Sequence, residues 1–472
     1  MEAEERNRPR RAIGFRDLVL FYVVTGISLR WISTAAAAGP SAIVIWIIAW
    51  LAFFVPLALS VIELSSRYPE EGGLYVWSKR AFGDFGGFIS AWIYWVSNLP
   101  YFPAVLYFAA GNALFVGGSR WSHFSKTSYF VSFSVLALAL IVILNITGVG
   151  IARWLYNVGA VSMWIPAMIV IVMGIISWVR FGPATEFSRT SLTPSTGLKD
   201  VIFWSTITFA LGGCEAASFM GGEIKDARRN IPRALIIGGS LVTMAYILGT
   251  VCVLLALPQS EVSSLQGLME AIVKAAQRIG FAPIVPIAAL LITLSNLGAA
   301  GAFLAAAARL PFVAGIDRFL PAAFASLHPR WRTPYIALLT QGIFGVLFIF
   351  LGQAGSTVKA AYDILVNIGV ITYFIPYLFV FAALIRLQRE VAGPDVIRVP
   401  GGKPIAVIVG TVGFAASLTT IVLSLIPPQG EVNKVLGVTK VVGLTMLLIA
   451  SGVCLYLVGR RKIQAATRGS RA

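Results

Sequence analysis

Long uncharged apolar runs recur along this sequence from one end to the other, and they constrain its fold more than any other feature. A helix needs about 20 apolar residues to cross roughly 30 Å of hydrocarbon. Backbone N–H and C=O groups in hydrocarbon must be bonded within the segment, so each run is expected to be helical. Only 12% of the residues are charged, against roughly a quarter in soluble domains. We predict an all-α membrane protein of twelve transmembrane helices, near residues 16–38, 41–66, 84–116, 127–149, 153–179, 200–223, 232–257, 281–309, 333–352, 360–386, 402–427 and 437–459.

The charged residues lie mainly in the gaps between these runs. Lys and Arg number 37 against 20 Asp and Glu, which gives a net charge of +17. Short cytoplasmic loops are enriched in Lys and Arg, and most of the cations fall on the inner side if the N-terminus is cytoplasmic. Topology therefore explains the charge without a nucleic-acid partner. We expect a multi-pass protein of the cell membrane, in contact with lipid, with both termini in the cytoplasm and an N-terminal tail rather than a cleaved signal.

Cysteine and histidine are scarce in the chain. The three cysteines lie inside apolar runs, and the two histidines are far apart in the sequence. This pattern predicts no disulfide framework, metal site or cofactor. It also disfavours a membrane enzyme, which would need clustered His, Cys or acidic residues at one membrane face.

Two of the expected helices are interrupted, and they are five spans apart. Residues 25–30 (TGISLR) interrupt the first span, and residues 210–215 (ALGGCE) interrupt the sixth. Because five is odd, the two helices run in opposite directions, and such paired broken helices are typical of inverted-repeat transporters. We expect an N-terminal tail at 1–15, a first repeat at 16–180, a second repeat at 200–388, two additional helices at 400–459 and a basic tail at 460–472.

The interrupted helices predict a binding site near the middle of the membrane. A break frees N–H groups on one helical stump and carbonyls on the other, which is tolerated where they line a cavity or bind a ligand. An amino acid suits such a site, with its carboxylate at amides and its ammonium at carbonyls. The candidate amides are those of Ser28, Leu29 and Arg30, and the candidate carbonyls are those of Gly26, Ile27 and Phe209. Gly212 and Gly213 mark either this site or close helix packing.

Two charged residues lie at membrane depth. Glu215 is expected to be a gate or coupling group, or else a structural hydrogen-bond acceptor, because a carboxylate there costs about 2.5–3.5 kcal/mol. Arg30 is 14 residues from Arg16, roughly 21 Å along a helix, so it needs a partner: Glu215, a substrate acid group or backbone carbonyls. A guanidinium is a bidentate match for a carboxylate, which favours negatively charged substrates over polyamines.

The remaining polar and aromatic residues are expected to have ordinary roles. Asp17, Glu63, Glu223 and Asp363 are near span ends, where a solvated charge needs no special role. Most membrane aromatics are interfacial or packing residues. Those that could instead close over a ligand are Trp31, Trp92, Trp95, Tyr94, Tyr101 and Tyr107.

Several motifs resemble those of the amino acid-polyamine-organocation superfamily, and the resemblance covers about residues 14–460. The motifs are residues 63–77 (ELSSRYPEEGGLYVW), 212–218 (GGCEAAS) with 225–232 (KDARRNIP), and 317–324 (DRFLPAAF) before 333–334 (TP). Residues 397–403 (IRVPGGK) and 424–428 (SLIPP) look most like the bacterial glutamate/γ-aminobutyrate antiporters and their polyamine-carrying relatives.

The resemblance implies a five-plus-five inverted repeat that works by alternating access. It places a substrate site between helices 1, 3, 6, 8 and 10. By position, Phe209 matches an aromatic gate residue and Glu215 an acidic gate residue of the arginine/agmatine relatives. The sequence departs from the family at residues 27–30 (ISLR), where a Gly-Ser-Gly-type break is usual. Ser162 lies near the place where proton-coupled members carry a lysine, so that coupling device is not carried over.

These observations together predict a secondary transporter of amino acids or related amines, either an exchanger or a proton-linked symporter. Its substrate site would contain Arg30 and Glu215 as paired charges, and the broken helices would hinge at Gly26 and at Gly212–Gly213. The rival interpretations are an ion channel and a carrier of other solutes with the same fold. A monomer and a homodimer both fit the sequence.

Overall fold

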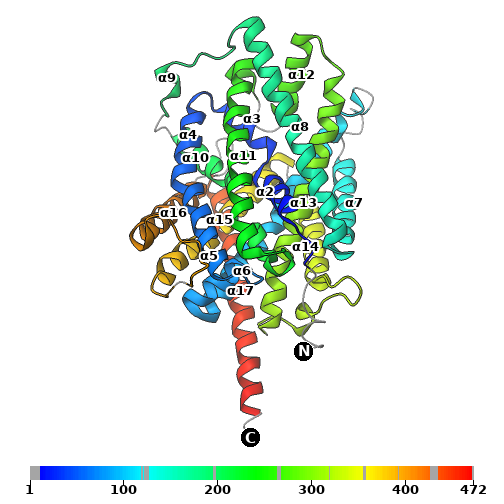
Figure 1. The fold of residues 1–472 in the computed structure, drawn as a ribbon. Helices are drawn as coiled ribbons and strands as arrows, with labels where there is room; N and C mark the ends of the chain where they lie inside the picture. Colours follow the sequence, from blue (N-terminus) through cyan, green and yellow to red (C-terminus); the bar gives the residue numbers. More distant parts are fainter. Residues whose placement is uncertain are drawn as a thin grey trace.

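The computed structural model describes residues 11–118, 121, 127–194, 198–262, 267–317, 319–353, 358–391, 393–425 and 434–469. Over these ranges the chain is helical, and its one β-bridge joins Ile13 to Ile224. Residues 1–10 of the expected N-terminal tail and 470–472 of the expected basic tail lie outside the described residues. Figure 1 shows the helices as one upright bundle, with both ends of the chain at the lower side and helices α9 and α12 at the upper side.

The first five expected spans are all helical. The first consists of α2 (Phe15–Gly26) and α3 (Leu29–Ala37), and the second of α4 (Ser41–Ala49), a π-helical turn (Trp50–Phe54) and α5 (Val55–Arg67). The next three are α6 (Leu74–Leu114), α7 (Thr127–Ile146) and α8 (Val149–Phe181). Helix α6 is kinked at Gly83, where φ is +77°, so the segment before the kink is separate from the expected span at 84–116.

The second group begins, like the first, with a broken helix. It contains α10 (Leu198–Ala210) followed by the 3₁₀ helix η3 (Ala216–Glu223), then α11 (Ala227–Ala256), α13 (Ile284–Ile316), α14 (Tyr335–Gln353) and α15 (Val358–Leu387). Two short helices, α9 (Arg189–Leu192) and α12 (Gly267–Ile279), lie in the connections. Helices α16 (Gly402–Ser424) and α17 (Lys434–Gly469) follow, and the end of α17 projects below the bundle (Figure 1).

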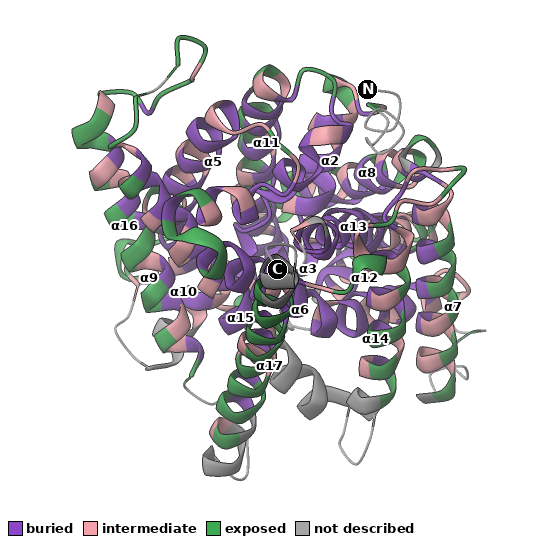
Figure 2. Ribbon diagram, turned by 90° about the horizontal axis from the view of Figure 1, so that it is seen from below, coloured by how far each residue is buried: buried purple, intermediate pink, exposed green. Residues whose placement is uncertain are grey.

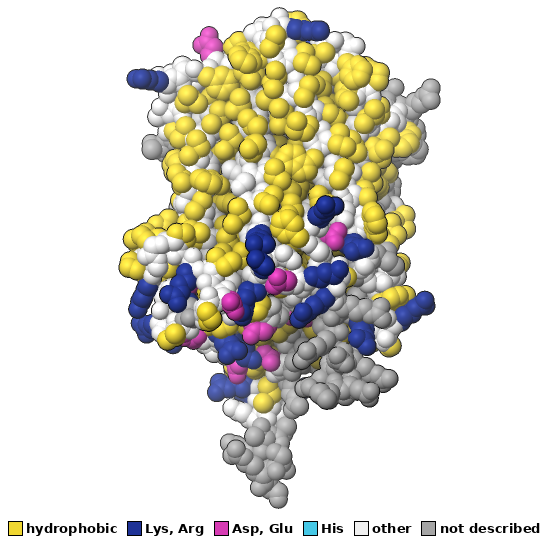
Figure 3. Space-filling model, viewed as in Figure 1, with side chains coloured by type: hydrophobic (Ala, Val, Ile, Leu, Met, Phe, Trp, Pro, Cys, Tyr) yellow, Lys and Arg dark blue, Asp and Glu magenta, His cyan; other side chains and the backbone are white. Residues whose placement is uncertain are grey.

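Nine helical segments in the described ranges are long and apolar enough to cross a membrane. Figure 3 shows the matching surface: hydrophobic side chains cover most of this face, and charged side chains gather near the side where the chain ends. An apolar band of this kind suits lipid, because lipid-facing positions gain nothing from polar groups. The protein is therefore an all-helical, multi-pass membrane protein.

The interior is formed by the helices that carry the breaks and by those that pack on them. Helix α6 packs against α13 and α15, while α11 packs against α2, α5 and α8. Figure 2 shows the buried residues concentrated at the centre of the bundle, with exposed residues on the outer faces of α7, α14, α16 and α17. The broken helices therefore lie in the best-packed part of the molecule, where unpaired backbone groups are most costly.

Candidate binding site between the two broken helices

The first break spans Ile27 and Ser28, and a tyrosine from another helix bridges it. Both residues are extended, with ψ values of 130° and 113°. The Tyr246 hydroxyl of α11 donates to the Gly26 carbonyl at 2.9 Å and accepts from the Ser28 N–H at 2.8 Å. One side chain thus bonds a carbonyl and an amide that the break frees. The Tyr246 ring is held in turn by stacking on Trp46, with centroids 4.6 Å apart.

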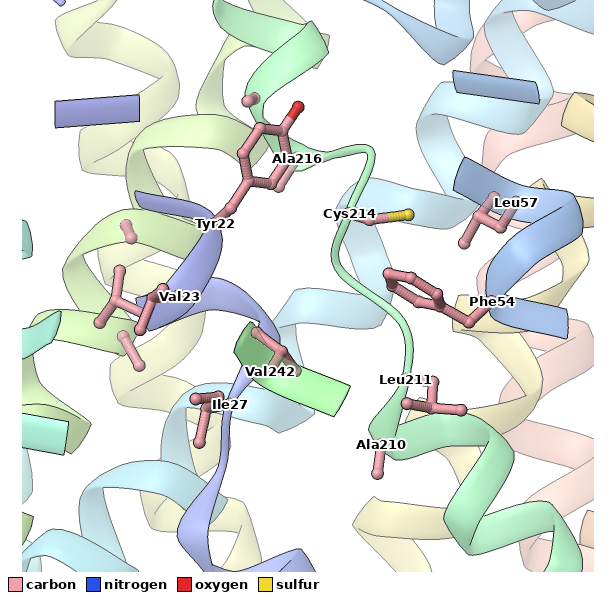
Figure 4. Close-up of a cluster of buried hydrophobic side chains, with 14 of the residues drawn as sticks. Tyr22, Val23, Ile27, Phe54, Leu57, Ala210, Leu211, Cys214, Ala216 and Val242 are labelled. Carbon is pink, nitrogen blue, oxygen red and sulfur yellow. The ribbon is translucent and has the colours of Figure 1, made fainter. Parts of the chain in front are cut away.

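The second break runs from Leu211 to Glu215 and depends on its glycines. Gly213 has φ +105°, and a Cβ there would lie 2.9 Å from the Thr25 carbonyl oxygen of the first broken helix. At Gly212 a Cβ would lie 2.6 Å from the Tyr373 ring of α15. Figure 4 shows the break as an open trace that passes Cys214 and Leu211, with Ile27 opposite. Close packing therefore accounts for both glycines, and it brings the two broken helices together.

A buried cavity of about 80 Å³ lies between the two breaks. Six of the residues predicted for the site line it: Gly26, Ile27, Ser28, Arg30, Phe209 and Gly212. Leu29, Gly213 and Glu215 are not among the described lining residues. Polar lining also comes from other helices, through Ser97, Asn98, Tyr101, Tyr246, Asn296 and Tyr373. The cavity is therefore polar at selected points and lined elsewhere by aliphatic and aromatic side chains, as small-molecule sites usually are.

Arg30 extends from the first turn of α3 to the cavity and is 9% exposed. Its guanidinium carbon lies 4.1 Å from the centroid of the Trp31 ring, a cation–π contact. Trp31 meets Phe209 edge to face at 5.7 Å, and Phe209 meets Tyr373 at 5.4 Å. Trp31 and Phe209 both line the cavity, and the helices that carry them, α3 and α10, lead to the upper side in Figure 1.

Glu215 is fully buried and lies behind a cavity-lining tyrosine. Its Oε1 accepts hydrogen bonds from the Tyr94 hydroxyl at 2.7 Å and from the Tyr373 hydroxyl at 3.1 Å. Tyr373 itself lines the cavity. Glu215 is therefore connected to the cavity by its hydrogen bond with Tyr373. The pairing of Arg30 with Glu215 stays a prediction.

The sequence interpretation missed three tyrosines of the site. Tyr246, Tyr373 and Tyr377 are each more than 150 positions from the breaks they contact, and nothing in the local sequence marks them. Of the aromatic candidates, Trp31 and Tyr101 line the cavity and Tyr94 binds Glu215. The others are elsewhere: Trp92 donates to the Leu448 carbonyl, Trp95 packs on Trp92, and Tyr107 donates to the Ile349 carbonyl.

The expectation that Glu63 and Glu223 are solvated is wrong. Glu63 is 1% exposed and accepts from Arg67, from Gln388 and from the Val399 N–H. Glu223 is 2% exposed and forms a buried ion pair with Arg309 of α13 at 2.5 Å. The burial arises because the ends of these helices fold against neighbouring helices, which span positions alone do not reveal.

A third carboxyl group, that of Glu71, lies beside the Glu223–Arg309 pair, in the turn between α5 and α6. Its Oε2 would be 2.9 Å from a Cβ placed on Gly222. Burial, together with the negative charge of Glu223, raises the pKa of Glu71 to about 8, although Arg309 acts in the opposite direction. Glu71 is therefore mostly protonated at neutral pH.

No cluster of three or more His, Cys, Asp or Glu residues that could hold a metal ion occurs in the part of the chain that the structure describes. The site instead offers backbone dipoles, one guanidinium, hydroxyls and amides around a buried cavity. Groups of these kinds suit a small polar solute, which they can hold by charge and hydrogen bonding. Two broken helices in a multi-pass bundle are typical of membrane carriers.

The chain belongs to the amino acid permease family, whose model matches residues 13–459. A transporter of Legionella pneumophila without assigned function is 28% identical over 90% of this chain and 91% of its own length. A protein of Lactococcus lactis named as a probable agmatine/putrescine antiporter is 24% identical over 91% of this chain and 90% of its own length. A glutamate/serine transporter of Bacillus subtilis is 23% identical over 78% of this chain and 70% of its own length. The expected membership of the amino acid-polyamine-organocation superfamily is confirmed, and the protein is a secondary transporter.

Proposed function

We propose that this transporter carries amino acids or related amines by alternating access, with the cargo bound in the cavity between the two broken helices. The observation that carries the proposal is that residues of both breaks line one buried cavity. The relatives named as transporters of glutamate and serine or of agmatine and putrescine support this range of cargo.

In the proposed binding mode, the α-carboxylate of an amino acid lies at the backbone amides of the first turn of α3. A helix N-terminus attracts anions because its amides and its dipole are both positive there. The ammonium lies at the C-terminal end of α10, near Phe209 and Ala210, where the dipole is negative. Since Tyr246 already bonds the Gly26 carbonyl and the Ser28 N–H, it holds the break open while the cargo binds beside it.

Two sets of contacts serve as gates in this proposal. On the α3 side, Phe209 and Trp31 must separate to admit cargo. On the opposite side, the hydroxyls of Tyr373 and Tyr94 donate hydrogen bonds to Glu215. Loss of these hydrogen bonds opens a path for cargo beside η3. Glu215 is the group to which we assign proton coupling, because it responds to cargo through Tyr373.

The proposed topology has twelve spans. Nine segments qualify by length and composition, and the others are α6 after its kink, the α10–η3 pair and α14. Residues 16–180 and 200–388 then form the two inverted repeats, and 400–459 the additional pair. We propose that both termini are cytoplasmic, because charged side chains gather at the side where the chain ends.

Counterflow in proteoliposomes tests the proposal. Vesicles loaded with one unlabelled amino acid or amine at a time should take up the same labelled compound, with saturation and with stimulation by internal cargo. Phe209→Ala should abolish exchange, whereas Phe281→Ala, at an exposed position, should not. Non-saturating electrical flux without stimulation by internal cargo would indicate a channel and overturn the proposal.

A further inference from the structure

We infer that the cargo is an amino acid with an acidic side chain, and that Arg30 is the residue that selects it. This inference rests on the proposed function, because it assigns a substrate class to the same cavity. It adds that a carboxylate on the side chain of the cargo binds the Arg30 guanidinium, and that diamines and polyamines are excluded.

The first support is the charge of the cavity. Among the described residues that line it, Arg30 is the one charged side chain, and the polar remainder consists of hydroxyls, amides and backbone groups. The carboxyl group of Glu215 lies behind Tyr373 and is bonded by two hydroxyls. Among these lining residues, a bound solute therefore meets one positive charge and no negative charge.

The second support is the way Arg30 is held. Its guanidinium lies against the Trp31 ring, and its backbone carbonyl accepts from Ser33 at 2.8 Å and from Thr34 at 2.9 Å. Arginine has a planar group that can lie flat on an aromatic ring and bind a carboxylate through two parallel hydrogen bonds, whereas lysine offers a point charge. The contact with Trp31 positions the guanidinium before cargo arrives, which reduces the entropy lost on binding.

The third support is the charge that each kind of cargo brings to the guanidinium. An amino acid with an additional carboxylate brings a negative charge to Arg30, whereas a neutral zwitterion brings no net charge. A putrescine dication would place like charges together in a buried site of low dielectric constant, which is unfavourable. Because Trp31 touches Arg30 on one side and Phe209 on the other, a carboxylate that fixes Arg30 also favours closure of that gate.

The first experiment compares cargo of equal shape and different charge. Purified wild-type protein in proteoliposomes is tested for counterflow of L-glutamate, L-glutamine and putrescine. We expect kcat/KM for glutamate to exceed that for glutamine by about tenfold to a hundredfold, because a hydrogen bond to a charged group is the stronger one. Putrescine should give no saturable exchange.

The second experiment changes Arg30. Arg30→Gln should lower kcat/KM for glutamate about 100-fold, the usual effect of removing one partner of a buried charged contact. Exchange of glutamine should change less than about threefold, since its amide makes no charge pair. Arg30→Lys should recover part of the glutamate activity. The matched control is Arg228→Gln, an exposed arginine paired with Asp395, and gel filtration with thermal unfolding checks that each variant is folded.

The outcomes separate the two proposals. Preference for glutamate that is lost in Arg30→Gln supports the substrate class. Equal or better exchange of glutamine by the wild type, or saturable exchange of putrescine, overturns the substrate class and leaves the proposed function intact. Absence of saturable exchange for any amino acid or amine overturns the proposed function itself.

Discussion

Gly213 shows at the scale of one residue how tightly the site is built. Its positive φ and the 2.9 Å approach to the Thr25 carbonyl oxygen leave no room for a Cβ. We expect Gly213→Ala to destabilise the protein by about 1–3 kcal/mol, the usual cost of a strained backbone residue, and to abolish exchange. Thermal unfolding in detergent and counterflow measure the two effects. Gly443→Ala is the control, because a Cβ at that helical position meets nothing within 4 Å, and equal losses in both variants would contradict the argument.

The Tyr246 hydroxyl makes a second prediction possible. Tyr246→Phe keeps the ring stacked on Trp46 but removes the bonds to the Gly26 carbonyl and the Ser28 N–H. We expect a loss of about 1–3 kcal/mol of stability, because buried backbone groups lose their partner, and a clear fall in exchange rate. Tyr129→Phe, whose hydroxyl bonds the Ala110 carbonyl outside the cavity, should retain exchange. Unchanged transport in Tyr246→Phe would show that the break does not need this bridge.

Glu71 gives a prediction about pH. Its pKa is about 8 in the folded protein against about 4.3 in an unfolded chain. Between these two pH values the folded state binds more protons than the unfolded state. The free energy of unfolding therefore falls as the pH rises, and the fall is complete above the folded pKa. Glu71→Gln cannot ionise, so its advantage in Tm over the wild type should grow between about pH 5 and pH 8 and then stay constant. The exposed neighbour Glu70 offers the control Glu70→Gln, and an advantage independent of pH would refute the assignment.

The sequence identified the backbone of the site better than its side chains. Glycines within apolar runs marked both breaks, because glycine weakens a helix at a depth where its backbone groups would otherwise have to stay bonded. Tyr246 and Tyr373 belong to helices that look continuous and apolar, and their contacts depend on how distant helices pack. A pattern along one segment contains no information about such contacts, so these residues emerged only from the three-dimensional structure.

At the scale of elements, the end of η3 joins several parts of the molecule. The Glu223 carbonyl accepts from the N–H groups of Ala12 and Ile13, and the Lys225 N–H donates to the Ile13 carbonyl. The Glu223 side chain binds Arg309 of α13, next to Glu71. These contacts hold four segments together: the residues before α2, the end of η3, the α5–α6 turn and α13. In the alternating access that we propose, these contacts open when the cavity faces this side.

The Glu223–Arg309 pair can be tested by a double-mutant cycle. Arg309→Met should destabilise the protein by about 3–5 kcal/mol, because it leaves a buried carboxylate unpaired. Adding Glu223→Gln should recover much of that loss, since the buried charge is then gone. Thermal unfolding midpoints in detergent measure both effects. The exposed pair Arg228–Asp395 is the control, with an expected effect of about 0–1 kcal/mol, and additive losses in the cycle would mean that the two residues are not coupled.

Helix positions were predicted well because hydropathy decides them directly. The boundaries α4–α5, α8 and α16 lie close to the expected spans at 41–66, 153–179 and 402–427. The π-helical turn at Trp50–Phe54 and the kink at Gly83 were not predicted. Both are local changes of helical winding within apolar or amphipathic sequence, and they depend on packing against neighbours rather than on composition.

At the scale of the whole molecule, apolar and charged side chains occupy different parts of the surface seen in Figure 3. The apolar face in Figure 3 fits lipid, while the side near the chain ends carries most of the charges seen in that view. The cation count in the sequence predicted the same arrangement, because loops are hydrophilic regardless of how the helices pack. Orientation relative to the cell is a property that the fold alone does not determine, since a bundle can be inserted either way.

Cysteine labelling in intact cells tests this orientation. In a background where Cys454, the exposed cysteine among the three, is replaced by serine, we expect Glu186→Cys to react with a membrane-impermeant maleimide added outside. Glu186 comes three residues before α9, a helix on the upper side in Figure 1, and Gln464 belongs to α17, whose end projects below the bundle. Gln464→Cys should therefore react only after the cells are opened, which controls for its reactivity. The reverse pattern would place the termini outside, and labelling of both sites in intact cells would rule out twelve spans with both ends in the cytoplasm. Because the two sites lie at opposite ends of one bundle, the comparison decides which proposed gate faces the cytoplasm: the one at Trp31–Phe209 or the one formed by Tyr94 and Tyr373 on Glu215.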